Sequence, residues 1–546
     1  VMGTTELSLY MLISITSMAI CMAITPVMMR LAPAIGMVDK PGKRKVHTAA
    51  IPRSGGVGIV IGLLVPLIIW LDLDRFSLSL ISGCLILLIF GAWDDARNIR
   101  PKYKFFGQII AAVVVVYYGD IYVFHFPFMG FEELSPYLGK PFTVVAMVGM
   151  ITALNLSDGL DGLAGGEALI SLAAISYLAF QFDGAIAMTI TAATIGGIFG
   201  FLRFNSHPAR IFMGDAGSQT LGFILGVMVV YLTQQLNPVV SPVIALLLLG
   251  LPVIDSLIVF YMRAKRGDSL VVPAKDHLHH RLLNLGLYHY ESVMVIYSIQ
   301  TLLVIFAVLM PYESDLLLIS IYLGLSIILY SLIVIAEKRN WKAHISSLKS
   351  PLFLSDLVIK HKIISIIPIR VVEIGLSVIL IGSVLMATSV PSDIGISSLL
   401  LMFFLVLSLI TGWFGVGLFR LVVFVSAGTS VFLISEYPPD WLLEQVYLVY
   451  AFYTLMVISA FIVARLNLSE KFNITPLDYL VIVIALVVAG APGIDISSTS
   501  ITWMVIQMII LFYSAELLMQ TFRGCRNRFS GIVLASLILI AARGIA

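Results

Sequence analysis

The chain has 546 residues, of which 60% are apolar and only 12% are charged. The charged share is far below that of a typical soluble domain, and the mean hydropathy is +1.03. This composition excludes disorder, collagen, coiled coils and ordinary soluble enzyme folds. The formal net charge of +2 gives no reason to expect nucleic acid as a partner.

We expect an all-α, polytopic integral membrane protein, because in lipid only helices and closed barrels satisfy every backbone group. The alternating ten-residue strands of a barrel are not seen. About 11 spans are expected in the N-terminal part, near 7–31, 54–71, 77–93, 105–119, 141–156, 167–182, 185–202, 216–233, 242–262, 292–310 and 316–336. About seven more are expected after them, near 366–389, 396–416, 421–434, 442–464, 478–490, 501–521 and 530–542.

The distribution of Lys and Arg predicts the orientation of these spans. With the N-terminus outside, loops after odd-numbered spans are cytoplasmic. All but three of the 33 basic residues then lie inside, the exceptions being Arg75, Lys140 and Arg543. A basic interval divides the chain. We therefore expect a catalytic membrane domain over 1–338, a cytoplasmic linker over 339–357 and a second transmembrane domain of unknown function over 358–546.

The first cytoplasmic loop, residues 39–56, carries a cluster of basic side chains followed by paired glycines. Lys45, His47 and Arg53 belong to this cluster. Such a loop suits a ligand that bears phosphate. Ordinary positive charge at the inner membrane surface is the alternative explanation.

The second cytoplasmic loop, residues 94–108, begins with the adjacent carboxylates Asp94 and Asp95 and continues with basic residues that include Lys104. Paired carboxylates at a membrane edge are costly unless cations or a metal ion neutralise them. The pattern indicates a site, and local ion pairs at a solvated helix end are the alternative.

The third cytoplasmic loop begins at Asn155 and holds Asp158 and Asp161 among several glycines. A helical turn would bring the two carboxylates to one face, and the glycines allow a ligand to approach the backbone closely. The spacing does not match a calcium-binding loop. A plain turn is the alternative, but two aspartates with this many glycines at a span boundary favour a site.

The fourth loop, residues 204–218, places Asp215 among small residues just before a span. A carboxylate at such a helix start suits a metal and phosphate site, and a helix cap is the competing explanation. The fifth loop carries a histidine run that ends in a basic residue; its candidate ligand-binding residues are His277, His279, His280 and Arg281. A structural zinc site would need four Cys or His ligands, so contact with phosphate or nucleotide fits this run better.

All five loops follow odd-numbered spans and therefore face the same side, which supports one composite site. Its carboxylates would hold a hard cation, most simply Mg²⁺ with Mn²⁺ as a substitute, and its basic groups would hold phosphates. The position at the membrane surface suggests one water-soluble phosphorylated substrate and one lipid phosphate.

These motifs resemble the polyprenyl-phosphate N-acetylhexosamine-1-phosphate transferases, integral membrane enzymes of glycosyltransferase family 4. From about Asp39 to Gly286 the chain has, in order, RK-x-H, PR-x-GG, the DD pair, N-x-x-DG-x-DGLA, FMGD-x-GS and H-x-HH. The LPVIDSLIVF stretch also gives Asp255 a family position. The HLHHR run resembles the branch that uses UDP-N-acetylglucosamine or a similar UDP-HexNAc. One departure concerns donor recognition: an acidic position that often precedes the histidines is Ala274 here.

The resemblance implies that a polyprenyl phosphate, undecaprenyl in most bacteria, attacks the sugar-proximal phosphorus of a UDP-HexNAc. UMP leaves, and polyprenyl-diphospho-HexNAc remains in the bacterial cytoplasmic membrane. This is the first lipid-linked step of cell-envelope polysaccharide synthesis. A homodimer is common in the family.

The resemblance also implies a role for each candidate residue. Asp215 and Asp161 are assigned to magnesium and the donor diphosphate, and Asp94 and Asp95 to the lipid phosphate, which they would orient or deprotonate. Asn155 and Asp158 would shape the nucleotide pocket. The remaining candidates would contact phosphates or sugar; they are His277, His279, His280, Arg281, Lys104, Lys45, His47 and Arg53.

Two alternatives stay open at this point. The donor can be UDP-MurNAc-pentapeptide or another UDP-HexNAc. A transporter is the alternative of another class, but it should place polar residues at mid-membrane on broken helices, whereas here the acidic clusters lie at span ends on one face.

Overall fold

The computed structural model describes residues 4–39, 50–129, 132–267, 276–343, 362–411, 415–466, 495–496, 499–521 and 526–545. The chain forms two compact units. The first consists mainly of Thr16–Ser346, and the second consists of Met2–Ile15 and most of the chain after Ser346. The expected division between 1–338 and 358–546 falls near this boundary.

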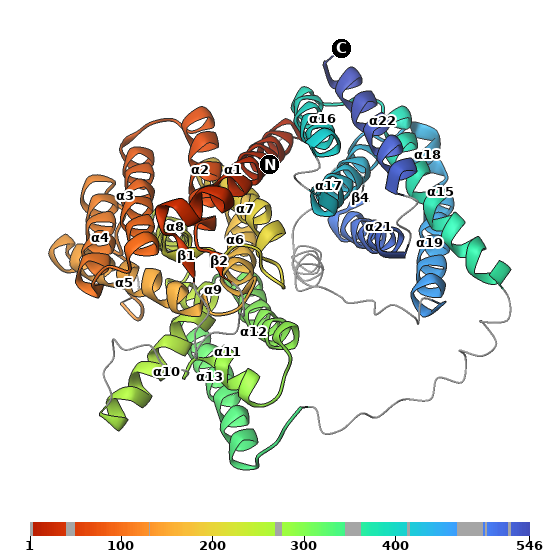
Figure 1. The fold of residues 1–546 in the computed structure, drawn as a ribbon. Coiled ribbons are helices and arrows are strands. Elements are labelled where there is room, and N and C mark those ends of the chain that lie inside the picture. The colour runs from red at the N-terminus through yellow and green to blue at the C-terminus, as the bar shows by residue number, and fades with distance from the viewer. Residues whose placement is uncertain are drawn as a thin grey trace. The chain divides into compact units, whose positions relative to one another are not determined.

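The first unit is almost entirely helical (Figure 1). Its helices are α1 (Thr4–Ile35), which begins within the second unit, α2 (Gly55–Trp70), α3 (Arg75–Arg97), α4 (Pro101–Val113), η1 (Val114–Tyr118), α5 (Pro136–Ser157), α6 (Leu163–Gln181), α7 (Ala185–Asn205), α8 (Gly214–Val230), η2 (Tyr231–Leu236), α9 (Ile244–Leu248), α10 (Gly250–Arg266), α11 (Leu278–Asn284), α12 (His289–Leu309) and α13 (Asp315–Lys338). Strands β1 (Val38–Asp39) and β2 (Ile51–Pro52) pair antiparallel, with Asp39 opposite Ile51.

The second unit contains α15 (Lys362–Met386), α16 (Ser392–Thr411), α17 (Gly415–Glu436), α18 (Asp440–Glu444), α19 (Val446–Leu466), β3 (Asp495–Ile496), β4 (Thr499–Ser500), α21 (Ile501–Thr521) and α22 (Arg526–Ile545). Strands β3 and β4 are antiparallel. The span expected near 478–490 lies outside the described residues.

Within the described parts of both units, nine helices are long and apolar enough to cross a membrane, and shorter apolar helices accompany them. The prediction of an all-α, multi-pass membrane protein is therefore confirmed.

Helix α8 lies inside the first unit and packs against α2, α3, α5 and α6. Small residues at its N-terminal end allow this close packing. A Cβ atom on Gly56 of α2 would lie 2.1 Å from the Gly217 nitrogen, and one on Gly91 of α3 would lie 2.4 Å from the Ala216 Cα. As at other membrane helix contacts, small residues let the backbones approach. The C-terminal end of α3 is thereby brought to the start of α8.

The structure differs from the continuous span expected near 242–262, because the helix breaks between α9 and α10. Pro252 has no N–H to donate to the Leu248 carbonyl. Instead, the Gln300 side chain of α12 donates to that carbonyl at 2.9 Å and accepts from the Leu251 N–H at 3.2 Å. A broken helix at membrane depth needs such substitute partners.

Candidate active site

Asp95 binds the N-terminal end of α8. Its Oδ1 accepts from the Asp215 N–H at 2.9 Å and its Oδ2 from the Ala216 N–H at 3.1 Å. The Asp95 side chain is fully buried, and Arg53 Nη2 lies 3.3 Å from Oδ1. The start of a helix carries unpaired N–H groups and partial positive charge. The Asp95 carboxylate therefore stabilises the start of α8.

Asp94 lies beside Asp215 in a cluster of polar groups from four helices. Its carboxyl group is within hydrogen-bonding reach of the Asp215 carboxyl group. Asp215 also forms an ion pair with Lys104 and accepts from Asn155 Nδ2 at 3.0 Å and from Gln219 Nε2 at 3.1 Å. Two carboxylates this close repel each other unless a proton or a cation lies with them. In this structure Lys104 supplies the positive charge.

Asp158 follows α5 and is partly buried next to this cluster. Burial raises the pKa of Asp158 to about 7, and the nearby charge of Asp215 acts in the same direction, whereas Arg53 opposes it. Asp158 therefore changes its charge close to neutral pH, unlike an ordinary exposed aspartate.

The loop that carries Asp158 is held from several sides. Gly162 has a φ of +80°, a conformation that favours glycine. Its N–H donates to Asn205 Oδ1 at 2.8 Å, and its carbonyl accepts from the Tyr297 hydroxyl at 2.7 Å. The His279 ring lies against Gly159, where a Cβ atom would approach its Nε2 to 2.2 Å. The loop is thus fixed to segments that follow it by more than 40 residues.

Asp161 has different partners from Asp215. Its Oδ2 lies 2.7 Å from His207 Nδ1 and accepts from the Ala209 N–H at 3.0 Å. His289 Nε2 accepts from the Asp161 backbone N–H at 3.1 Å. Burial favours a raised pKa for Asp161, but the bonds from His207 and Ala209 outweigh it and lower the pKa. The assignment of Asp161 and Asp215 to magnesium stays a prediction.

A buried network orients the histidine run. Asp255 of α10 lies with its Oδ2 2.8 Å from His277 Nδ1, and its Oδ1 accepts from the Leu278 N–H at 2.9 Å. The Tyr330 hydroxyl of α13 also donates to Oδ1, at 2.8 Å. Asp255 therefore caps the first turn of α11 and fixes the ring of His277.

The other members of the run lie in dissimilar surroundings. His279 is buried, and burial together with neighbouring His280 lowers the pKa of His279 to about 3. It is therefore uncharged at neutral pH and can contact a phosphate as a hydrogen-bond donor but not as a cation. Arg281 donates two hydrogen bonds to the carboxylate of Glu337 on α13, at 2.8 and 2.7 Å. Its guanidinium is therefore paired with a carboxylate in this structure.

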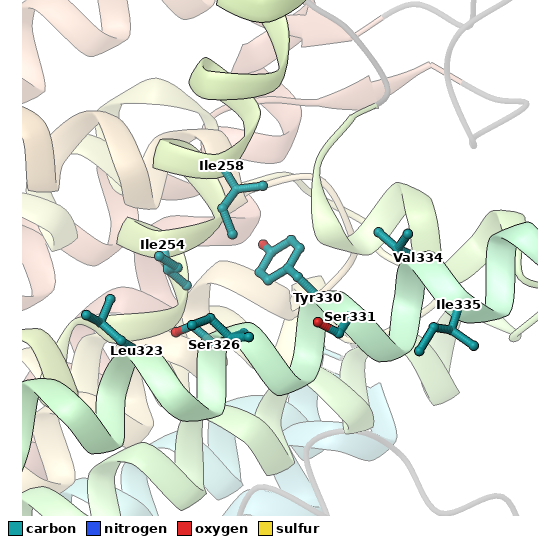
Figure 2. A pocket seen from close by; sticks show the side chains of 9 residues that line it. Ile254, Ile258, Leu323, Ser326, Tyr330, Ser331, Val334 and Ile335 are labelled. Atoms are coloured by element: carbon teal, nitrogen blue, oxygen red, sulfur yellow. The ribbon is translucent and has the colours of Figure 1, made fainter.

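An apolar groove lies between α10 and α13 beside this network (Figure 2). Ile254 and Ile258 line one side, and Leu323 and Ile327 line the other. Tyr330 also lines the groove while its hydroxyl binds Asp255. One residue thus belongs to both the apolar surface and the polar network that holds His277.

Known proteins resemble this chain over most of their length. A "Probable undecaprenyl-phosphate N-acetylglucosaminyl 1-phosphate transferase" of Bacillus subtilis is 34% identical over 327 residues, which are 59% of this chain and 89% of the relative. The chain belongs to glycosyl transferase family 4. The profile of that family matches residues 77–233.

Two further relatives carry similar names. An Escherichia coli O157:H7 "Undecaprenyl-phosphate alpha-N-acetylglucosaminyl 1-phosphate transferase" is 31% identical over 57% of this chain and 87% of its own length. A "Decaprenyl-phosphate N-acetylglucosaminephosphotransferase" of Mycolicibacterium smegmatis is 33% identical over 49% of this chain and 73% of its own length. The family recognised from the motifs is thereby confirmed.

The sequence motifs of glycosyl transferase family 4 do not reveal every residue at this site. His207, Asn205 and Gln219 lie within or beside the recognised motifs, but no spacing rule marks their contacts. His289 and Glu337 lie beyond the motifs altogether. Two predicted phosphate-binding residues, Lys45 and His47, lie outside the described residues.

Proposed function

We propose that this protein transfers GlcNAc-1-phosphate from UDP-GlcNAc to a polyprenyl phosphate in the bacterial cytoplasmic membrane. An oxygen of the lipid phosphate forms a bond to the sugar-proximal phosphorus of the donor. The bond from that phosphorus to the bridging oxygen breaks, and UMP leaves with the electron pair. Polyprenyl-diphospho-GlcNAc remains in the membrane.

The observation that carries the proposal is the cluster of Asp94, Asp215, Asn155 and Lys104 at the start of α8. Phosphoryl transfer needs positioning and neutralisation of negative charge more than covalent participation by the protein. A cationic side chain among carboxylates at a membrane helix end meets this need. The names of the relatives supply the donor sugar and the lipid acceptor.

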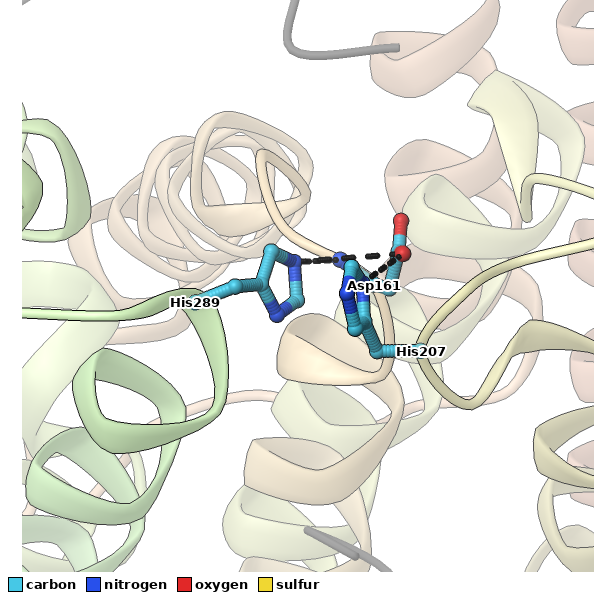
Figure 3. A group of neighbouring side chains, drawn as sticks. All are labelled: Asp161, His207 and His289. Carbon is cyan, nitrogen blue, oxygen red and sulfur yellow. Dashed lines mark hydrogen bonds and ion pairs between the residues drawn. The ribbon is translucent and has the colours of Figure 1, made fainter.

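The cluster has the chemistry of a magnesium site. Carboxylate and amide oxygens are hard donors of the kind that Mg²⁺ takes together with substrate phosphates. We assign Asp215 and Asp94 as the magnesium ligands, because Asp161 has His207 and His289 as its neighbours (Figure 3). Bound magnesium would supply charge neutralisation at the donor diphosphate.

The chain's own residues would act by binding and orientation. Lys104, which pairs with Asp215 in the structure, would turn to a substrate phosphate when another cation takes its place. His277, held by Asp255, would present its other ring nitrogen to the donor. A lipid phosphate is already largely ionised at neutral pH, so Asp94 need not act as a base.

We place the site on the cytoplasmic face, where the loops after odd-numbered spans carry nearly all the basic residues. This side also holds nucleotide sugars. A reporter enzyme fused after Lys338, active only in the cytoplasm, tests the orientation: an inactive fusion would contradict it.

The decisive experiment measures UMP release by the purified full-length protein in detergent. Polyprenyl phosphate, Mg²⁺ and a panel of UDP-sugars that includes UDP-MurNAc-pentapeptide are supplied, with EDTA and Asp215→Asn as controls. We expect lipid-dependent release with UDP-GlcNAc that EDTA and the substitution each abolish.

Other outcomes would revise the proposal. Release with UDP-MurNAc-pentapeptide alone would change the donor. Undiminished release by Asp215→Asn would remove that residue from the metal site. No release from folded protein with any donor would contradict the transferase function and favour transport.

A further inference from the structure

The second unit contains a pocket of about 270 Å³ at the end where α15 and α17 finish and α19 and α21 begin (Figure 1). Helix α15 packs against the other three helices, and the short helix α18 also lines the pocket. Gly375 lets α15 and α19 approach closely, since a Cβ atom there would lie 2.2 Å from the sulfur of Met456. The pocket lies well outside residues 77–233, which the profile of glycosyl transferase family 4 matches.

Three polar side chains that line this pocket have no hydrogen-bond partner among the described residues: Ser383 of α15, Tyr453 of α19 and Gln507 of α21. They are only 2%, 2% and 3% exposed, respectively. Buried polar groups are nearly always paired, so each of these needs an explanation. A serine hydroxyl can turn to the backbone of its own helix. The tyrosine hydroxyl and the glutamine amide oxygen therefore indicate a ligand more strongly than the serine does.

Most other residues that line the pocket are apolar or aromatic, and several of them are exposed. Trp441 of α18 and Leu448 and Tyr450 of α19 belong to this exposed group. The pocket therefore opens beside α18 and α19. Exposed apolar side chains on a helix of a membrane protein face lipid tails, and Trp and Tyr are common at the membrane interface. A molecule that reached the three buried polar groups would thus pass an apolar surface at the opening.

The polar groups of the pocket match a hydroxyl group. The amide oxygen of Gln507 can only accept a hydrogen bond, whereas the hydroxyl groups of Ser383 and Tyr453 can donate one. A single alcohol group can therefore donate to Gln507 and accept from Tyr453. A phosphate or carboxylate would have no cation to pair with, since none of the described residues that line the pocket is charged, and an unpaired buried charge is very unfavourable. Sites that enclose a drug-sized ligand measure roughly 300–1,000 Å³, so this smaller pocket suits a headgroup and the first carbons of a chain.

We propose that the second unit binds an uncharged lipid alcohol in this pocket. The hydroxyl group of the lipid lies between Tyr453 and Gln507, and its hydrocarbon chain leaves the pocket past Trp441 and Leu448. The chain is acyl, as in a diacylglycerol, or isoprenoid, as in a polyprenol, because both present the same headgroup chemistry. This inference does not depend on the proposed transferase function: the site lies within the second unit, and the acceptor of the proposed reaction carries a phosphate.

The test measures lipid binding to the purified full-length protein in detergent by native mass spectrometry. The probes are dioleoylglycerol and undecaprenol, and dioleoyl phosphatidic acid is the charged competitor. The variants are Tyr453→Phe, Gln507→Leu and the two combined. Ser430→Ala is the matched control, because it removes a buried hydroxyl group of α17 that also lacks a partner among the described residues but does not line the pocket.

We expect at least one of the two alcohols to bind to the wild type and equally well to Ser430→Ala. Tyr453→Phe and Gln507→Leu should each weaken this binding by roughly 3- to 10-fold, the effect of one hydrogen bond, and the double variant should weaken it further. The alcohol that binds more tightly identifies the kind of chain that the pocket takes.

Thermal unfolding without added lipid separates lost binding from lost folding. Neither Tyr453→Phe nor Gln507→Leu removes a hydrogen bond seen among the described residues, so both variants should unfold at the temperature of the wild type. Three results would overturn the proposal: no binding of either alcohol to the wild type, equal affinity in the double variant, or displacement of the bound alcohol by phosphatidic acid.

Discussion

Asp94 and Asp95 are neighbours in sequence but face different surroundings at the end of α3. Asp95 accepts from two backbone N–H groups of α8 and lies beside Arg53. Asp94 lies beside the carboxylate of Asp215. The DD motif therefore combines one residue that holds the start of α8 with one that lies beside Asp215.

This division predicts different effects of the same substitution. In Asp95→Asn the amide group offers one acceptor where the carboxylate offers two, and Arg53 loses a charged partner. We expect the free energy of unfolding to fall by about 2 kcal/mol, the scale of a hydrogen bond to a charged group. In Asp94→Asn the repulsion with Asp215 is relieved, so stability should change little while UMP release falls. Equal losses of stability in thermal unfolding would contradict the division.

The raised pKa of Asp158 predicts a pH dependence of stability. Its pKa is about 7 in the fold against an ordinary value of 3.8. Between these values the folded protein binds a proton that the unfolded chain does not bind, so the contribution of Asp158 to stability falls as pH rises from about 4 to about 7. Asp158→Asn removes this contribution.

The measurement is the unfolding temperature of the wild type and of Asp158→Asn at pH 5 and at pH 7.5. The advantage of Asp158→Asn over the wild type should be larger at pH 7.5 than at pH 5. Other titrating groups cancel in this comparison, and a difference that does not change with pH would contradict the assignment.

At the scale of elements, the interrupted helix α9–α10 depends on one side chain of α12. Gln300→Leu leaves the Leu248 carbonyl and the Leu251 N–H without the partners that they have in the structure. A buried polar group that loses its hydrogen-bond partner costs about 1–3 kcal/mol. We therefore expect the free energy of unfolding to fall by about that amount for each of these two backbone groups.

Pro252→Ala provides the matched test, because the substituted alanine has a backbone N–H that can reach the Leu248 carbonyl. In the double variant this helical bond should recover part of the stability lost in Gln300→Leu. A double-mutant cycle from thermal unfolding measures the coupling. Additive effects would show that Gln300 does not compensate for the proline.

The predicted spans agree with most helices because long apolar runs between charged loops leave little choice in a membrane. The break between α9 and α10 was not predicted, because hydropathy alone does not register it. At the site, motif spacing was sufficient to single out Asp94 and Asp215. It could not predict that Asp161 would meet His207 and His289, or that Arg281 would pair with Glu337, because these contacts depend on how distant helices pack.

At the scale of the whole molecule, every described residue of the candidate site, from Arg53 to Glu337, lies in the first unit. The Bacillus relative aligns over 327 residues, which are 89% of its own length. The aligned part therefore makes up nearly the whole of the relative. In this chain the aligned part is followed by a second helical unit. Compact units with their own cores commonly fold alone.

We therefore expect a chain that ends at Ser346 to fold and to release UMP at a rate within a few-fold of the full-length protein. The truncated Asp215→Asn variant is the control for activity, and thermal unfolding together with size-exclusion chromatography shows whether the shortened protein is folded. If the truncated protein folds but is inactive, the second unit supplies something that the reaction needs. A third outcome is that the truncated protein is active, but that only the full-length protein keeps its rate of UMP release at low acceptor concentration. The first unit would then be sufficient for the chemistry, and the second unit would contribute to lipid delivery.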